Sequence, residues 1–107
     1  MSLVRLPPRF HYIALAADPP LHDPLALRKI LQDALAAAFG LARAGAHIDV
    51  LACAPDAPAI LRVSAGDAQC VMAAVAAYAV PGRPRLSVLM DAPFLPALAV
   101  AGQAPVL

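Results

Sequence analysis

The stretch from Asp23 to Gly40, DPLALRKILQDALAAAFG, is the most strongly patterned part of the sequence. Asp23 is a favourable helix N-cap, Pro24 suits the first helical position, and glycine is a common residue just past a helix end. Between these ends, apolar residues recur at the spacing of one helix face, at Leu27, Ile30, Leu31, Ala34, Leu35 and Ala38. The pattern predicts an amphipathic helix that packs on a sheet.

Strand patterns and one further helix pattern flank this helix. Asp18-Pro19-Pro20 ends the preceding strand, because proline cannot donate to a sheet ladder. Turn residues at 55–58 separate the two strands that follow the helix, which predicts a hairpin. The expected elements are strands at 10–17, 47–53, 59–64 and 85–91, and a second helix between Gly66-Asp67 and Pro81-Gly82.

The second helix and the last strand are predicted in more detail. Asp67 is the expected N-cap of the second helix. The expected buried stripe of this helix comprises Val71, Met72, Val75, Ala76 and Ala79. Alternation along the last strand places Leu86, Val88 and Met90 on one face.

The order strand, helix, strand, strand, helix, strand is the split βαβ arrangement of ferredoxin-like domains. It predicts an α+β two-layer sandwich, with a four-stranded antiparallel sheet and both helices on one face. The 107 residues suffice for a single domain. Residues 1–9 are expected to form an extended arm, and residues 93–107 an apolar tail punctuated by prolines.

The two faces of the predicted sheet are both partly apolar. The face toward the helices would hold Ile13, Leu15, Ile48, Val50, Leu61, Val63, Leu86 and Val88. The opposite face would hold Tyr12, Asp49, Leu51, Ile60, Arg62, Ser87 and Leu89. An antiparallel sheet face open to water is usually polar, so we expect the tail from Phe94 onward or a partner protein to cover it. The predicted protein interface comprises Tyr12, Leu51, Ile60, Leu89, Phe94, Leu95 and Leu98.

The charge composition argues against a protein that binds nucleic acid mainly through phosphates. The net charge is +1, every acidic residue is an aspartate, and Lys29 is the single lysine. Neutralising many phosphates requires many more cationic side chains. The apolar share is 62%, against roughly 45–50% for soluble domains, which favours uncovered apolar patches and protein contacts. Weak RNA contacts are expected at Arg83 and Arg85, and next at Arg5 and Arg9.

No pattern of catalytic or metal-binding residues is present. The sequence has no phosphate-binding glycine loop, nucleophile elbow or paired carboxylates. His11, His22 and His47 are scattered, so no metal and no cofactor are expected. The predicted third strand lacks aromatic residues, which leaves Tyr12 as the only aromatic expected on the open sheet face and disfavours base stacking there. We therefore predict that the chain is not an enzyme.

The compartment is predicted from three sequence features. Cys53 and Cys70 lack metal-site spacing and are expected to be small core residues in a reducing compartment. The N-terminal residues lack a signal-peptide pattern. The longest apolar run, at 70–80, is about half the length of a membrane span. The expectation is a soluble intracellular protein without membrane contact.

Several short blocks carry a likeness to a known family. They are His11-Tyr12-Ile13, Ala37-Ala38-Phe39-Gly40, His47-Ile48-Asp49-Val50-Leu51, Ala59-Ile60-Leu61-Arg62-Val63, Gly82-Arg83 and Ala92-Pro93-Phe94-Leu95-Pro96-Ala97-Leu98. Through them the chain, from about Phe10 to Leu107, resembles the small α/β protein subunits shared by ribonuclease P and ribonuclease MRP. Within this family it is most similar to the branch of fourteen-kilodalton subunits, for which the Pro-Phe-Leu tail is the most specific block.

The resemblance implies a place in a nuclear and nucleolar ribonucleoprotein. Such particles remove 5′ leaders from precursor tRNA or process precursor ribosomal RNA, and their RNA holds the catalytic metals. The implied role is that of a non-catalytic subunit that pairs with a sister α/β subunit and a TIM-barrel-type subunit, with mostly indirect RNA contact. Two alternatives remain open: a homodimeric regulatory module of ferredoxin-like fold that binds a small ligand, and a small phosphatase-like enzyme.

Overall fold

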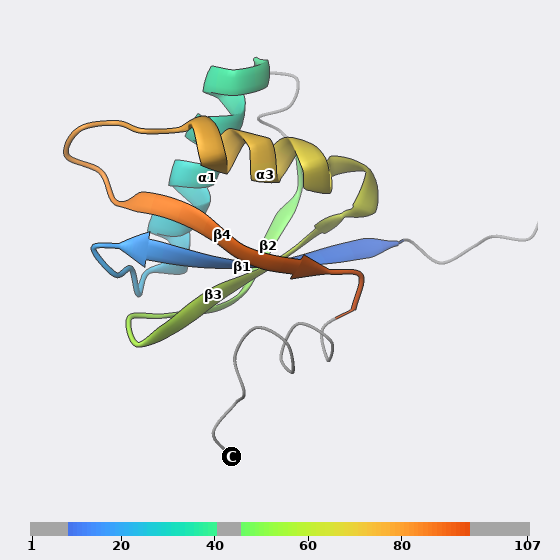
Figure 1. Ribbon diagram of the computed structural model, residues 1–107, viewed down its shortest axis with the longest axis horizontal. Coiled ribbons are helices and arrows are strands. Elements are labelled where there is room, and N and C mark those ends of the chain that lie inside the picture. The colour runs from blue at the N-terminus through green and yellow to red at the C-terminus, as the bar shows by residue number, and fades with distance from the viewer. Residues whose placement is uncertain (1–8, 41–45, 95–107) are drawn as a thin grey trace, which may run out of the picture.

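The computed structural model describes residues 9–40 and 46–94, which form a sheet with two helices on one of its faces (Figure 1). The sheet order is β2-β3-β1-β4, and all neighbouring strands are antiparallel. This order confirms the predicted ferredoxin-like α+β fold. The elements are β1 Phe10–Asp18, α1 Pro24–Phe39, β2 Ile48–Ala54, β3 Ala57–Ser64, η1 Ala65–Asp67, α3 Ala68–Ala77 and β4 Arg85–Ala92.

Helix α1 begins and ends as its sequence predicts. The Asp23 carboxylate accepts a hydrogen bond of 3.0 Å from the Leu25 amide, and Gly40 ends the helix with a φ of 87°. The predicted apolar face is buried from Leu27 to Leu35, but Ala38 is exposed. Figure 1 gives the reason, because the last turn of α1 rises away from the sheet.

Helix α3 begins where it is predicted to, with Asp67 as its N-cap residue, but it ends at Ala77, before Pro81-Gly82, and its buried stripe differs. The single 3-10 turn of η1 precedes it, and Asp67 makes no side-chain capping hydrogen bond. Residues Ala76 and Ala79 are exposed, while Met72 is only partly buried. The buried stripe comprises Ala68, Val71, Ala74 and Val75. Because nearly every residue of this helix is apolar, its sequence does not distinguish the two neighbouring faces, and packing against α1 and the sheet selects between them.

The core between the helices and the sheet contains the strand residues that alternation predicts. Six of them are buried, and Val50 and Val88 are partly buried against the same cluster. The six buried strand residues are Ile13, Leu15, Ile48, Leu61, Val63 and Leu86. Burying a branched aliphatic side chain contributes about 1.5–3 kcal/mol, so this layer is the main source of stability.

A β-bulge in β4 overturns one prediction from simple alternation. Ala14 pairs with Met90 and Leu15 with Val88, which leaves Leu89 as an extra residue. Met90 therefore packs with Ala14 in a separate cluster on the other face of the sheet, and does not join Val88 in the core. A bulge follows from a strand-pairing register, which the sequence of one strand does not reveal.

Two leucines of α1 provide a matched test of this packing. Leu31 is 1% exposed and Leu25 is 73% exposed. Leu31→Ala should lower the free energy of unfolding by about 2–5 kcal/mol, because it leaves a cavity in the core. Leu25→Ala should change it by less than about 0.5 kcal/mol. Urea denaturation of both variants measures the difference, and equal losses would contradict the described packing.

Candidate binding surface on the open sheet face

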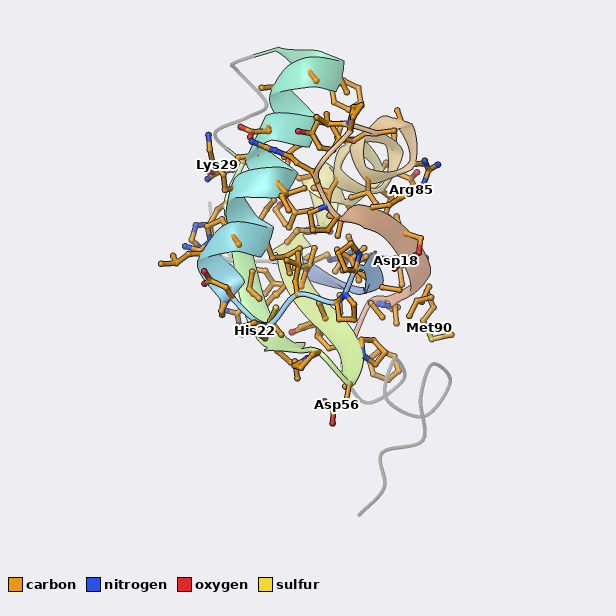
Figure 2. The ribbon with its side chains drawn as sticks, turned by 90° about the vertical axis from the view of Figure 1, so that its left-hand side faces the viewer. Asp18, His22, Lys29, Asp56, Arg85 and Met90 are labelled. Carbon is orange, nitrogen blue, oxygen red and sulfur yellow. The ribbon has the colours of Figure 1, made fainter. Side chains whose placement is uncertain are left out.

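The sheet face away from the helices, called here the open face, carries a small apolar cluster of its own. Ala14 and Ala92 are buried at its centre. Tyr12, Ile60 and Met90 pack around these alanines and are partly buried. Figure 2 shows Met90 projecting outward from β4, on the opposite side of the molecule from Lys29 of α1. A patch of this kind on a sheet face is suited to contact with another molecule.

The two predicted interface leucines that the structure describes lie in the strands at opposite edges of the sheet. Leu51 is the extra residue where the β2–β3 register shifts, and Leu89 is the extra residue of β4. Their side chains are 43% and 52% exposed, respectively. The interface residues predicted from the sequence therefore divide into a central pair, Tyr12 and Ile60, and these edge leucines. Phe94 lies beyond the end of β4, and Leu95 and Leu98 lie outside the described residues.

The charges on the open face are neutralised within it. Arg62 donates to Asp49 Oδ2 from Nη2 at 2.8 Å and from Nε at 3.1 Å. This hydrogen-bonded guanidinium lowers the pKa of Asp49, and His47 Nε2, 2.8 Å from Asp49 Oδ1, adds to the effect. The same contact raises the pKa of Arg62. The pair leaves little net charge for recruiting phosphates.

Phe10 is a second aromatic residue on this face, which corrects the expectation that Tyr12 would be alone there. Arg62 Cζ lies 4.7 Å from the centre of the Phe10 ring. The contact is a cation–π interaction across the β1–β3 ladder. Alternation with Tyr12 is the signal that could have placed Phe10 on this face, since the two residues are two positions apart in one strand.

A hollow of about 500 Å³ lies at the start of β1. Pairing between β1 and β4 stops at Tyr12 and Ala92, so β4 does not cover the two preceding residues of β1. His11 Nε2 lies 2.5 Å from Asp91 Oδ2, a contact that joins the two strands at this end. The hollow is lined by Arg9, Phe10, His11, Tyr12, Ala65, Pro93 and Phe94.

Of the three predicted RNA-contact arginines that the structure describes, Arg83 and Arg85 line one hollow beside the loop before β4, and Arg9 lines another. Arg83 Nη1 donates to Asp33 Oδ2 at 2.6 Å and to the Tyr78 hydroxyl at 3.0 Å, which ties the loop before β4 to α1. These contacts lower the pKa of Asp33 and raise that of Arg83. Arg85 begins β4, opposite Asp18 in the register with β1.

Of the remaining two predicted arginines, the structure describes only Arg9, which directly precedes β1. Arg9 lines the hollow, and Arg5 lies outside the described residues. Among residues 9–40 and 46–94, the structure shows no ion pair for Arg9 or Arg85. Of the predicted RNA contacts that the structure describes, Arg9 and Arg85 are therefore the two without an ion-pair partner among these residues.

The histidines and cysteines do not converge. Within the described part of the chain, no three histidine, cysteine or acidic side chains are grouped closely enough to hold a metal ion. Cys53 donates from Sγ to the Leu21 carbonyl at 3.5 Å, and burial raises the pKa of its thiol. Cys70 is a free, partly buried cysteine at the edge of the core. Neither described helix is long and apolar enough to cross a membrane.

Comparison with known proteins is informative among the solved structures. No protein-family model and no curated protein matches the chain. Among solved structures, the chain is similar to one in the cryo-EM structure of yeast ribonuclease MRP, with a TM-score of 0.66 and 19% sequence identity. The match covers 97% of this chain and 82% of that one. At this identity the likeness establishes a shared fold over nearly the whole chain.

The Asp49–Arg62 contact predicts a specific acid sensitivity. Because the folded-state pKa of Asp49 lies below the ordinary value of about 3.9, the contact stabilises the fold above that pH. This contribution is lost as the pH falls through the lower folded-state pKa. The melting temperature of Asp49→Asn should be below that of the wild type at neutral pH, and the gap should shrink below about pH 4. Asp56→Asn, in the β2–β3 turn, is the reference, and a gap that stays constant with pH would contradict the assignment.

Proposed function

We propose that this chain is a non-catalytic protein subunit of ribonuclease P or ribonuclease MRP. The observation that carries the proposal is the fold match to a chain of yeast ribonuclease MRP over 97% of this chain. The sequence blocks that resemble the same family support it independently. In this role the chain acts as a scaffold for removal of 5′ leaders from precursor tRNA and for precursor ribosomal RNA processing. Its location would then be the nucleus and nucleolus.

The chemistry of the open face suits a docking surface better than a catalytic one. Its charged groups are tied to one another, as with Asp49 and Arg62, and its centre is apolar. Leu51 and Leu89 each expose roughly half of an aliphatic side chain at the sheet edges. Exposed aliphatics beside a neutralised charge favour a protein partner.

The occupant we propose for the aliphatic part of the open face is the sister small α/β subunit. A partner of the same ferredoxin-like fold has a sheet face of matching width, so Leu51, Ile60 and Leu89 would all be covered in one contact. A TIM-barrel-type subunit is the second proposed protein partner. RNA contact is proposed to be local and mostly indirect, which is consistent with a net charge of +1.

A tagged copy of the full chain provides the direct test of this function. It should co-purify with a structured RNA and with the sister and TIM-barrel-type subunits. The purified particle should cleave precursor tRNA or ribosomal RNA, whereas the chain alone should not. Sequencing the recovered RNA identifies the particle. A tight homodimer without RNA, which binds a small ligand such as an amino acid, would contradict the proposal and favour a regulatory module.

A pair of leucine variants locates the protein contact. Leu51→Asp should reduce recovery of the sister subunit by about tenfold or more, because it places a charge in a desolvated interface. Leu25→Asp, at the strongly exposed start of α1, should leave recovery unchanged. Both variants should melt close to the wild type, since neither leucine is buried in the free subunit. If Leu51→Asp retains full recovery, the sister subunit binds elsewhere.

A further inference from the structure

The hollow at the start of β1 is lined by side chains for which the sequence predicts two different kinds of contact. Arg9 was expected to contact RNA, whereas Tyr12 and Phe94 were expected to contact protein. The structure places all three around one hollow of about 500 Å³. This volume lies within the range of roughly 300–1,000 Å³ that is usual for small-molecule pockets.

Aromatic rings in the lining of this hollow can stack against a base. Phe10 and Tyr12 come from β1, and Phe94 follows the end of β4. The guanidinium of Arg62 lies over the Phe10 ring and holds it in place. Phe94 is 55% exposed, so its ring offers a large apolar surface that a flat ligand would remove from water. Rings of this kind are the usual platforms for unpaired bases.

Polar groups around the rings supply contacts for a base edge and a phosphate. Arg9 has no ion pair among the described residues, so its charge is available. His11 Nε2 lies 2.5 Å from Asp91 Oδ2, so this ring nitrogen is already engaged within the chain. Among the described residues, β4 does not pair with Phe10 and His11, so the β4 side of β1 has no strand partner there. Backbone N–H and C=O groups on such an edge are strong hydrogen-bonding partners.

We propose that this hollow binds one unstacked nucleotide of a single-stranded RNA segment, with the base against the rings and a phosphate at Arg9. The inference deepens the proposed function and rests on it for the source of the RNA. RNA is favoured over a protein segment because the lining contains rings, a guanidinium and an imidazole but no leucine, isoleucine or valine. The aliphatic side chains that suit a protein partner lie outside the hollow, with Ile60 in the apolar cluster of the open face and Leu51 in the edge strand β2.

The charge distribution sets the expected salt dependence. Arg9 is the single unpaired cation in the lining, so one phosphate is neutralised on binding. For single-stranded RNA this corresponds to a slope of about −0.7 in a plot of log affinity against log salt. Stacking is therefore expected to provide most of the binding free energy, and the affinity should depend only weakly on salt concentration.

Binding of fluorescein-labelled octauridylate to the full chain tests the site. Phe94→Ala should weaken binding about 5- to 100-fold, the range of one base–aromatic stacking contact. Arg9→Gln should weaken it and also flatten the salt slope. Phe39→Ala and Lys29→Gln are the matched controls, because they remove an exposed ring and an equal charge outside the hollow. Both controls should stay within about twofold of the wild type.

Photo-crosslinking with 4-thiouridine RNA, in the chain and in the purified particle, provides a second measurement. Crosslinks at Phe10, Tyr12 or Phe94 are expected. Equal weakening by all four variants, or absence of crosslinks at these rings in both samples, would overturn the inference. A p-benzoylphenylalanine at position 94 that captures the sister subunit and no RNA would also overturn it and assign the hollow to protein.

The failure of this site and the failure of the proposed function are distinguishable. Suppose that particle RNA and the sister subunits are recovered, but that Phe94→Ala and Arg9→Gln do not change RNA binding. The proposed function would then be supported and the site rejected. Specific octauridylate binding at the hollow, without recovery of particle RNA or sister subunits, would support the site and reject its place in the ribonuclease particle.

Discussion

Burial of Ile13 and Leu15 beneath the two helices is the constraint on which the rest of the structure depends. Both residues lie in β1, which is a central strand, and both are almost completely inaccessible to water. Because side chains alternate along a strand, this burial directs Phe10, Tyr12 and Ala14 to the opposite face. A one-residue slip would exchange the two sets and expose the core, so the register is strongly specified.

The open face has two parts that differ in their chemistry. Toward the middle of the sheet, Ile60 and Met90 flank the buried Ala14 and make an aliphatic patch. Toward the start of β1, where β4 has ended, aromatic rings and the Arg9 guanidinium surround a hollow. The Asp49–Arg62 pair lies on the same face and removes most of its charge. A single face can therefore serve a protein partner and a nucleotide at adjacent positions.

The small number of charged groups limits the kinds of contact that this surface can make. With a net charge of +1, the chain lacks the electrostatic field that drives non-specific nucleic-acid binding. Arg83, a prominent cation in the sequence, is engaged by Asp33 and serves to hold the loop before β4 against α1. Contacts made by this chain must accordingly rely on shape, stacking and apolar area. Such contacts suit a subunit that is placed within a larger assembly, as proposed from the match to yeast ribonuclease MRP.

The sequence alone determined the fold class, because local patterns and the core alternation agreed. The caps of α1 and the buried faces of β1, β2 and β3 follow from the spacing of Asp23, Gly40 and the aliphatic residues. Only the tertiary structure decided where α3 is buried, because its nearly uniform apolar sequence carries little periodic signal. The tertiary structure also decided that Met90 leaves the core, since the bulge at Leu89 depends on pairing with β1. The hollow likewise depends on Arg9 and Phe94, which are far apart in sequence and meet only because β1 and β4 are neighbours with opposite directions.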